Sequence, residues 1–212
     1  MTIKILLVDD HRIVREGIRS LLEDDPDLEV IAEAENGRQA VQLSRELSPD
    51  VVILDVAMPD LNGIEATRQI VADVPGTRVI ALSMHRAKRF VAEMFKAGAS
   101  GYLPKDCASS EMVLAIRDVV ANRTYLSPRI AGDVLKDYAS GAGSTEASAL
   151  APREREVLQM LAEGKTTKQI ALHINLSVKT VETYRERIMK KLGINSLAEL
   201  TKYAIREGLT SL

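Results

Sequence analysis

The sequence contains one cysteine, Cys107, and no run of apolar residues long enough to cross a membrane. A single cysteine cannot form a disulfide within the chain, and a membrane-spanning helix needs roughly 18–20 apolar residues. The first ten residues, Met-Thr-Ile-Lys-Ile-Leu-Leu-Val-Asp-Asp, also lack the basic start and the small-residue cleavage site of a secretory signal. These absences predict a protein of the reducing cytoplasm that has no membrane partner.

The composition is that of a folded globular protein, because 46% of the 212 residues are hydrophobic and 27% are charged. The length allows one large domain or two small ones. The net charge of −2 hides an uneven distribution, since residues 1–149 carry −6 and residues 150–212 carry +4. An acidic first part and a small basic second part favour two domains, the second of which can meet a polyanion.

Short apolar segments alternate with amphipathic segments over the first 120 residues. We predict strands at residues 3–8, 28–34, 51–54, 78–82 and 100–103, and helices at residues 11–22, 38–47, 64–71, 90–97 and 111–120. In the second strand either Val30 and Ala32 face inward, or Ile31 does if the register slips. The alternation predicts an α/β fold, a flavodoxin-like, doubly wound, five-stranded parallel sheet of order 2-1-3-4-5 with right-handed crossovers.

Polar residues follow four of these strands at the end where an open α/β sheet binds its ligands. Asp9 and Asp10 end the first strand, and Asp55 ends the third. Taken alone, Asp55 would most simply cap the next element. The predicted strand order, however, brings the three acids together and lets Ser83 and Lys105 arrive from the fourth and fifth strands.

Such a cluster suits a particular chemistry. Three adjacent carboxylates repel one another unless they share a divalent cation, and all-oxygen ligands with room for water suit magnesium (Mg2+). A carboxylate can also attack a phosphoryl group and form an aspartyl phosphate. The added negative charge would then need a cation and a hydroxyl donor, which Lys105 and Ser83 could supply.

Four segments resemble the receiver domain of two-component response regulators. They are Leu-Leu-Val-Asp-Asp-His (6–11), Val-Ile-Leu-Asp-Val-Ala-Met-Pro-Asp-Leu-Asn-Gly (52–63), Ala-Leu-Ser-Met-His (81–85) and Ala-Gly-Ala-Ser-Gly-Tyr-Leu-Pro-Lys-Asp (97–106). The resemblance covers residues 3 to about 122. It implies that Asp55 accepts phosphate from a sensor histidine kinase. It also implies that Asp10 binds Mg2+ directly and Asp9 mainly through water, with Asp55 and the backbone C=O of Ala57 as the remaining protein ligands.

The same resemblance gives roles to residues on the other side of the cluster. Lys105 would pair with the phosphate, Ser83 would turn towards it, and Tyr102 would be the switch aromatic that swings inward. Without the resemblance, a serine at a strand end and a half-buried tyrosine are commonly structural. His85 lies two residues after Ser83, and we hypothesise that it affects autodephosphorylation.

The sequence beyond residue 120 divides into a linker and a second domain. Residues 128–138 could form a short helix, and residues 139–149 are rich in Gly, Ser and Ala, as in a flexible tether. We therefore predict a receiver at residues 1–122, a linker with a possible short helix at 123–148 and a second domain at 149–212.

The second domain is predicted to be a small all-α unit of four helices, at residues 153–162, 167–174, 178–192 and 196–207. Thr166 and Gln169 form a capping box, and Ser177 caps the third helix. Two helices joined by a short turn in a basic domain indicate a helix-turn-helix that binds DNA.

This region resembles the LuxR-type output domain of NarL/FixJ response regulators. The resemblance rests on Pro-Arg-Glu-Arg-Glu-Val-Leu (152–158), Gly-Lys-Thr-Thr-Lys-Gln-Ile-Ala (164–171), Leu-Ser-Val-Lys-Thr-Val-Glu-Thr-Tyr-Arg (176–185) and Ile-Met-Lys-Lys-Leu-Gly-Ile (188–194). It implies that residues 178–192 form the recognition helix in the major groove. The implied DNA-binding residues at its start and on its DNA face are Lys179, Thr180, Glu182, Thr183, Arg185 and Arg187. The implied phosphate contacts are Thr166, Lys168, Lys190 and Lys191, for which a solvated surface is the alternative.

Two positions depart from the family pattern. Ala151 stands where a capping Thr or Ser is usual, so the second domain's first helix loses about 1 kcal/mol of N-cap stabilisation. Glu182 stands where many relatives have Lys. A carboxylate can accept from cytosine N4 but repels phosphate, so the preferred DNA site should differ from theirs.

Together these features predict a cytoplasmic response regulator that controls transcription. Phosphorylation of Asp55 would rearrange the face around Ser83 and Tyr102, and the basic domain would then dimerise on paired half-sites. The expected partners are a sensor histidine kinase, double-stranded DNA and a second copy of the chain, with RNA polymerase as a further candidate. The only catalysis expected is the receiver's own phosphorylation and dephosphorylation.

Two alternative functions compete with this interpretation. A phosphatase of the haloacid dehalogenase type would need an Asp-x-Asp motif after the first strand, where this chain has Asp9-Asp10-His11. The second alternative is a DNA-binding regulator that works without phosphorylation, under the control of a ligand or protein partner. The complete acidic set with Ser83 and Lys105 argues against it.

Overall fold

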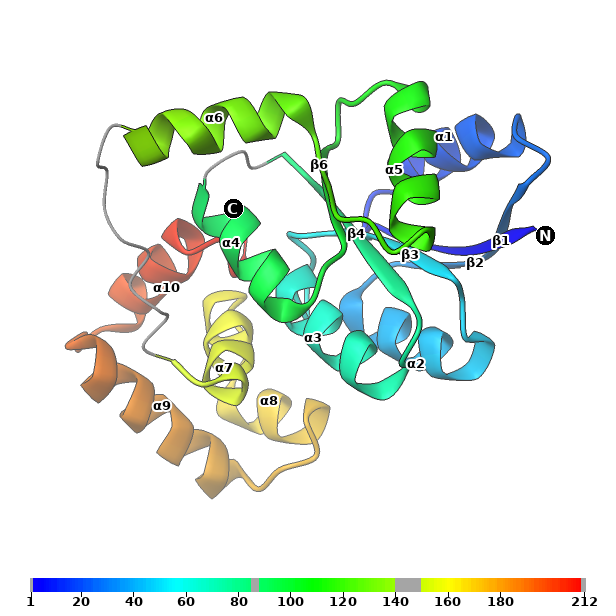
Figure 1. Cartoon of the computed structure of the whole chain (residues 1–212). Coiled ribbons are helices and arrows are strands. Elements are labelled where there is room, and N and C mark those ends of the chain that lie inside the picture. The colour runs from blue at the N-terminus through cyan, green and yellow to red at the C-terminus, as the bar shows by residue number, and fades with distance from the viewer. Residues whose placement is uncertain (1, 85–87, 140–149, 211–212) are drawn as a thin grey trace.

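The alternating segments form a parallel sheet with helices on both faces (Figure 1). Its strands are β1 (Ile3–Val8), β2 (Leu28–Ala34), β3 (Val51–Asp55), β4 (Arg78–Ser83), β5 (Gly101–Pro104) and β6 (Tyr125–Leu126). They lie in the order β2-β1-β3-β4-β5-β6, and every neighbouring pair is parallel. The computed structural model describes residues 2–84, 88–139 and 150–210.

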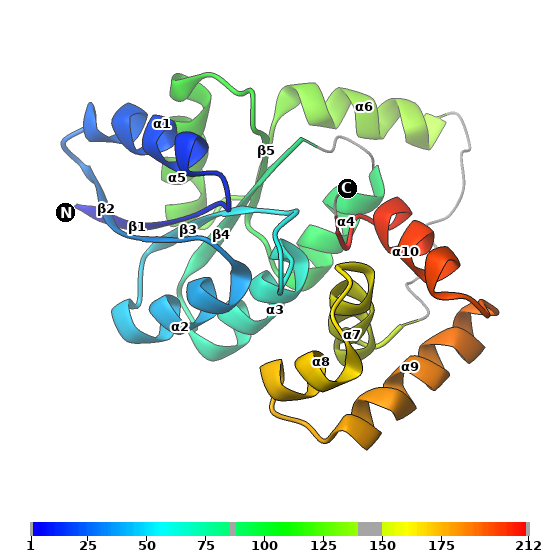
Figure 2. The same ribbon diagram turned by 180° about the vertical axis from the view of Figure 1, so that it is seen from behind.

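Two layers of helices bury the sheet because successive strand residues point to opposite faces. The helices α1 (Arg12–Glu23) and α5 (Ser109–Val120) cover one face, where they pack on Ile5, Leu7 and Ile53. The helices α2 (Gly37–Leu47), α3 (Gly63–Asp73) and α4 (Lys88–Ala97) cover the other, as Figures 1 and 2 show. This is the doubly wound architecture expected from the sequence.

The prediction of five strands was one strand short. Tyr125 and Leu126 form β6, which pairs with Gly101 and Tyr102 of β5 and extends the sheet. The following helix, α6 (Pro128–Ala139), packs Ile130 into the hydrophobic core beside α4. A strand of two residues is too short to show alternation in a sequence, so residues 125–126 were predicted only as part of the linker, whereas the possible short helix expected at residues 128–138 is present as α6. The expected tether falls largely on residues 140–149, which lie outside the described residues.

The ambiguity in the second strand has a structural cause. The register against β1 shifts at this point, because Ile5 pairs with Val30 whereas the next residue, Leu6, pairs with Ala32. Ile31 is the extra residue of a β-bulge. As a result, Val30 packs on the α1/α5 side of the sheet and Ala32 on the α2/α3 side, so they do not share the inward face predicted for them.

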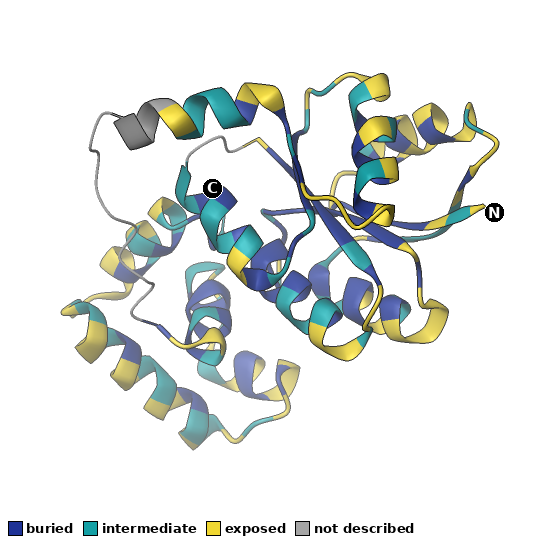
Figure 3. Cartoon of the chain, in the orientation of Figure 1, coloured by how far each residue is buried: buried dark blue, intermediate teal, exposed yellow. Residues whose placement is uncertain are grey.

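The second unit has its own hydrophobic core, formed from residues between Leu150 and Leu209. Its helices are α7 (Pro152–Ala162), α8 (Thr167–His173), α9 (Val178–Leu192) and α10 (Leu197–Arg206). Figure 3 shows the buried residues of α7 and the largely exposed outer side of α9. No helix within the described ranges is both long and apolar enough to cross a membrane.

The predicted helix starts of this unit are confirmed. The Thr166 hydroxyl accepts from Gln169 N at 3.3 Å, and the Gln169 side chain accepts from Thr166 N at 2.8 Å. The Ser177 hydroxyl accepts from Thr180 N at 3.1 Å. At α7 only half of such a box exists, because Glu154 accepts from Ala151 N at 2.8 Å while alanine has no side-chain acceptor to offer in return.

Candidate functional site

The carboxyl ends of β1, β3 and β5 bring Asp9, Asp55 and Lys105 together. Both carboxylates are almost fully buried, with 2% of Asp9 and 3% of Asp55 exposed. The Lys105 Nζ atom lies 2.7 Å from an oxygen of each. The backbone fixes this lysine as well, because Lys105 N donates to the Ser83 carbonyl at 3.0 Å. The strand order therefore builds a buried acid–lysine–acid bridge at this edge of the sheet.

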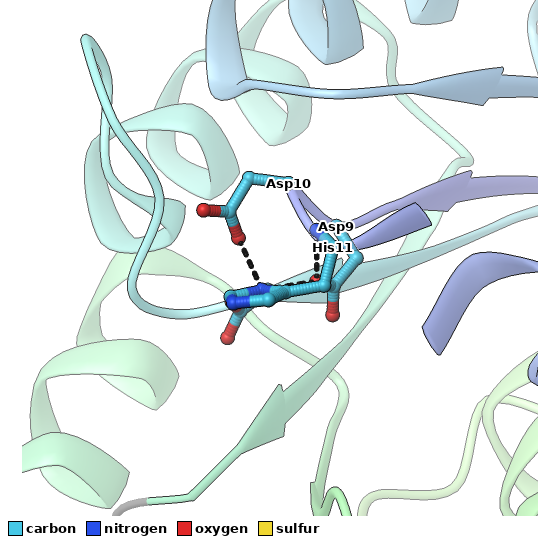
Figure 4. A group of neighbouring side chains, drawn as sticks. Asp9, Asp10 and His11 are labelled. Atoms are coloured by element: carbon cyan, nitrogen blue, oxygen red, sulfur yellow. Dashed lines mark hydrogen bonds and ion pairs between the residues drawn. The ribbon is translucent and has the colours of Figure 1, made fainter. Parts of the chain in front are cut away.

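Asp10 and His11 extend the bridge into a larger cluster, part of which Figure 4 shows. Asp9, Asp10, His11 and Asp55 each offer one ligand atom, and these atoms all lie within 4.8 Å of one another. The His11 Nδ1 atom lies 3.2 Å from Asp9 Oδ1 and 2.9 Å from Asp10 Oδ1. Three carboxylates against one ammonium leave an excess of negative charge, and carboxylate oxygens are the donors that Mg2+ prefers. The cluster therefore fits a divalent cation.

The loop between β3 and α3 holds the backbone beside Asp55. Ala57 N donates to Asp55 Oδ1 at 3.2 Å, and Asn62 caps α3 by accepting from Glu65 N at 3.0 Å. A Cβ atom on Gly63 would lie 2.2 Å from the Asp55 carbonyl oxygen, so only glycine allows this close approach. The Asn62-Gly63 pair thus forms a helix start that packs directly against the backbone of Asp55.

Burial sets the protonation of the central groups. It raises the pKa of Asp55 to about 6, against the opposing effect of the Lys105 ammonium. Burial alone would lower the pKa of Lys105, but the two neighbouring carboxylates outweigh it and raise that pKa. At neutral pH the site therefore holds an ionised Asp55 beside a charged lysine.

Ser83 and Tyr102 lie next to this cluster on β4 and β5. Ser83 is 1% exposed and Tyr102 is fully buried, so the tyrosine is already inside the protein. Burial raises the pKa of Tyr102 to about 12, while a hydrogen bond to the Ser83 side chain opposes the shift. The sequence suggested a half-buried ring that swings inward; here the ring starts from the inward position.

Arg15 was not predicted from the sequence as a site residue, but its side chain holds the backbone of Asp9 in place. Its side chain is almost fully buried and donates to the Asp9 carbonyl oxygen at 2.6 Å. It also lies 3.1 Å from Glu33 and 2.9 Å from Glu35. Arg15 precedes Ile18 and Leu22 at helical spacing, so an arginine on the apolar side of α1 was the available signal. The other notable position, His85, falls outside the described residues.

The predicted DNA-contacting residues lie mostly on the exposed side of α9. Lys179, Thr183 and Arg187 are all exposed and follow one another at intervals of four residues, which places them along one side of the helix. Together with Ser177, Thr180 and Tyr184 they line an open surface hollow. Glu182 is exposed beside them, and Arg185 is half-buried.

The residues predicted to contact DNA phosphates differ in whether their side chains already bind another residue of the protein. Lys168 and Lys190 are exposed on α8 and α9. The Lys191 Nζ atom instead lies 2.7 Å from Glu154 and ties the end of α9 to the start of α7. Thr166 is exposed, although its hydroxyl already caps α8. Lys168 and Lys190 are therefore the better placed for a phosphate.

Comparison with known proteins gives a consistent result for both units. Residues 5–117 match the response regulator receiver domain, and residues 148–204 match the bacterial regulatory proteins of the luxR family. The chain is a response regulator of the NarL/FixJ family. It combines a receiver with a LuxR-type DNA-binding domain, so this regulator is a DNA-binding transcription regulator.

Individual relatives match almost the whole regulator. Response regulator GacA of Pseudomonas aeruginosa is 40% identical over 208 residues, covering 98% of this chain and 97% of GacA. Response regulator UvrY of Escherichia coli is 39% identical, covering 98% of this chain and 95% of UvrY. Among solved structures, RcsB of Salmonella enterica serovar Typhimurium, bound to the rprA promoter with the phosphomimetic BeF3-, is 25% identical with a TM-score of 0.65. That match covers 96% of this chain and 98% of RcsB.

Proposed function

We propose that this regulator accepts a phosphoryl group on Asp55, with Mg2+ as cofactor, from a sensor histidine kinase in the cytoplasm. The observation that carries this proposal is the buried Asp55 carboxylate, which faces Lys105 at 2.7 Å and clusters with Asp9 and Asp10. A purely structural carboxylate would need its lysine partner but not two further acids. The surplus of negative charge is explained if a cation and a phosphoryl group complete the site.

In the transfer step an Asp55 oxygen forms a bond to phosphorus while the N–P bond of the kinase's phosphohistidine breaks. The histidine nitrogen keeps the electron pair and takes up a proton. With a pKa of about 6, Asp55 is mostly ionised at pH 7 and can act as the nucleophile. The Lys105 ammonium, 2.7 Å away, would neutralise charge on the transferred group.

Four groups of this chain would hold the metal: Asp10 and Asp55 directly, the Ala57 C=O, and Asp9 mainly through water. When bound, Mg2+ would supply positive charge to the phosphoryl oxygens. Lys105 bridges Asp9 and Asp55 at 2.7 Å from each, so metal binding at Asp9 would compete with this bridge.

The structural change caused by phosphorylation of Asp55 would be transmitted to the rest of the receiver through Ser83 and Tyr102. We infer that the Ser83 hydroxyl turns to the phosphoryl oxygens and gives up its bond to Tyr102. Because Tyr102 is already buried, the expected consequence is a new partner for its hydroxyl, and no inward swing of the ring is required.

We further propose that the phosphorylated protein dimerises on paired DNA half-sites, with α9 in the major groove. The support is the exposed row of Lys179, Thr183 and Arg187, together with the promoter-bound relative RcsB. RNA polymerase is a further candidate partner. We assign the receiver unit to residues 1–139 instead of 1–122, since β6 and α6 pack on its core, and the DNA-binding unit to residues 149–212.

A small phosphodonor with Mg2+ tests the central step without knowledge of the kinase. We expect one phosphate per chain on the wild type, located at Asp55 by mass spectrometry, and none on Asp55→Asn. Equal labelling of Asp55→Asn, or no labelling of the wild type, would contradict the proposal. In either case a regulator that works without phosphorylation at Asp55 would take its place.

A further inference from the structure

The first helix of the DNA-binding unit lies against the loop that follows Asp55. Figures 1 and 2 show α7 beside α3, with α9 on the far side of the unit. Gln159 of α7 is fully buried in this contact, and so is Asn62 of the loop. A fully buried amide side chain has to find hydrogen-bond partners, and here they come from the other domain.

Gln159 forms hydrogen bonds to the loop at two residues, Met58 and Asn62. Its Nε2 atom donates to the Met58 carbonyl oxygen at 2.8 Å, and its Oε1 atom accepts from Asn62 N at 3.1 Å and Asn62 Nδ2 at 2.9 Å. Nε2 also donates to Glu163 at 2.9 Å, which fixes the orientation of the amide. The Glu163 carboxylate accepts in turn from Asp60 N at 3.2 Å.

The loop to which Gln159 binds, residues 56–62, is short and directly connected to the acidic cluster. Met58 follows Ala57, whose N–H binds Asp55 and whose C=O is one of the metal ligands in the proposed function. The far end of the loop is tied back, because Gly63 N donates to the Val56 carbonyl at 2.9 Å. Asp60 adopts a left-handed conformation with φ of 67°, and it pairs with Lys165 of the DNA-binding unit. A shift at Met58 therefore moves Ala57 as well.

We propose that Gln159 is a positioning residue for the phosphoacceptor site. It acts from the DNA-binding unit, holding the Ala57 carbonyl where a divalent cation needs it. The inference rests on the proposed function of Asp55 and adds a residue from the other domain to that site. A loop that is already held loses less conformational freedom when the metal binds. By linkage, the metal then strengthens the docking of α7 by the same factor.

Two variants of the full chain test this assignment. Gln159→Glu keeps an acceptor for Asn62, but its ionised carboxylate cannot donate to the Met58 carbonyl and repels the Glu163 carboxylate, whereas Gln159→Met removes all of the hydrogen bonds at similar size. Each unit has its own hydrophobic core, so both variants should remain folded. The matched control is Arg38→Gln, which loses the cross-domain ion pair to Glu156; the hydrogen-bond partners of Arg38 in the DNA-binding unit are Glu156 and His173, and neither belongs to the loop.

The first readout is the affinity for Mn2+, a paramagnetic substitute for Mg2+, measured by electron paramagnetic resonance. We expect both Gln159 variants to bind Mn2+ about three- to tenfold more weakly than wild type, at or just below the lower end of the roughly 10- to 100-fold that supporting residues of metal sites contribute. Hydrogen exchange should rise at Ala57 and Met58, and the Mg2+ concentration for half-maximal labelling should rise while the maximal rate stays. Arg38→Gln should resemble wild type in all three.

The outcomes separate this inference from the proposed function. If the wild type is labelled at Asp55 but all variants bind Mn2+ like wild type, the role of Gln159 is overturned and the proposed function stands. If Arg38→Gln weakens Mn2+ binding as much as Gln159→Glu does, docking in general is responsible and the specific role is again overturned. If the wild type is not labelled at Asp55, the proposed function itself fails.

Discussion

The two functional surfaces of this regulator use charge in opposite ways. Around Asp55, residues from three strands converge, and the Lys105 Nζ atom lies 2.7 Å from an oxygen of each of the buried carboxylates of Asp9 and Asp55. On α9, Lys179 and Arg187 lie exposed along a single helix. Buried charges interact strongly and have unfavourable solvation, whereas exposed charges are screened by water and interact little. The first surface is therefore sensitive to one added group, whereas the exposed side chains of the second can contact DNA while contributing little to the stability of the fold.

The largest expected effect is a gain in stability when the buried acid is neutralised. Asp55→Asn should raise the free energy of unfolding by about 3 kcal/mol above pH 6 in the presence of EDTA, since each pKa unit corresponds to about 1.4 kcal/mol. The sign follows from the raised pKa of about 6. Below a pH of about 4, the pKa of Asp55 in the unfolded chain, Asp55 is protonated in both the folded and the unfolded protein. Wild type and Asp55→Asn should therefore have similar stability there. Wild type then loses stability as the pH rises through 6.

Urea denaturation of wild type and Asp55→Asn across this pH range measures the effect. A constant difference between the two proteins from pH 4 to pH 8 would show that burial of the Asp55 charge is not the cause.

The buried arginine should matter for stability where an exposed one does not. Arg15→Met removes the donor to the Asp9 carbonyl and the partner of Glu33 and Glu35, and we expect a loss of about 2 kcal/mol. Arg12 is the control, because it lies on the same helix with 82% of its side chain exposed and pairs with Glu16 at 2.7 Å. Arg12→Met should leave the denaturation midpoint unchanged. Similar losses in both variants would remove the distinction between buried and exposed charge.

The recognition surface should show the converse behaviour. Arg187→Ala should weaken DNA binding about tenfold or more, as expected for a side chain that contacts a base, while stability changes by less than about 0.5 kcal/mol. Lys202→Ala is the charge-matched control, because Lys202 is exposed on α10. Fluorescence anisotropy at a fixed salt concentration measures both. Equal weakening in the two variants would mean that net charge, and not the α9 surface, determines binding.

The smallest effect concerns the unfinished capping box of α7. Ala151→Ser should stabilise the DNA-binding unit by about 1 kcal/mol, because the serine oxygen can accept from the free N–H groups at this helix start. The same change at Ala198, inside the first turn of α10, should not stabilise, since Ser196 already caps that helix. A denaturation midpoint that does not move in Ala151→Ser would show that Glu154 alone satisfies this end.

The sequence was sufficient wherever one local pattern determined the outcome. Apolar strands ending in Asp9-Asp10 and Asp55 predicted the sheet and the acidic edge, and the cap residues Thr166 and Ser177 predicted the starts of α8 and α9. These features depend on neighbours within a few residues, so their signal is visible in the chain.

The rest depended on contacts between distant residues. The bulge at Ile31 arises from the pairing of β2 with β1. Likewise, β6 forms only because Tyr125 and Leu126 pair with the edge strand β5. Gln159 looks like an ordinary helix residue until the two domains meet at Asn62. No periodicity can reveal such partners, because they are set by tertiary packing.

One measurement tests most directly whether the buried acidic site controls the exposed DNA-binding surface. DNA fragments enriched by the phosphodonor-treated wild type serve as the probe, and binding is measured at one salt concentration with and without the donor and Mg2+. We predict that the treatment strengthens binding of the wild type severalfold, with dimer formation, and leaves Asp55→Asn unchanged. Equal strengthening of Asp55→Asn, or no change in a wild type that is labelled at Asp55, would contradict the account.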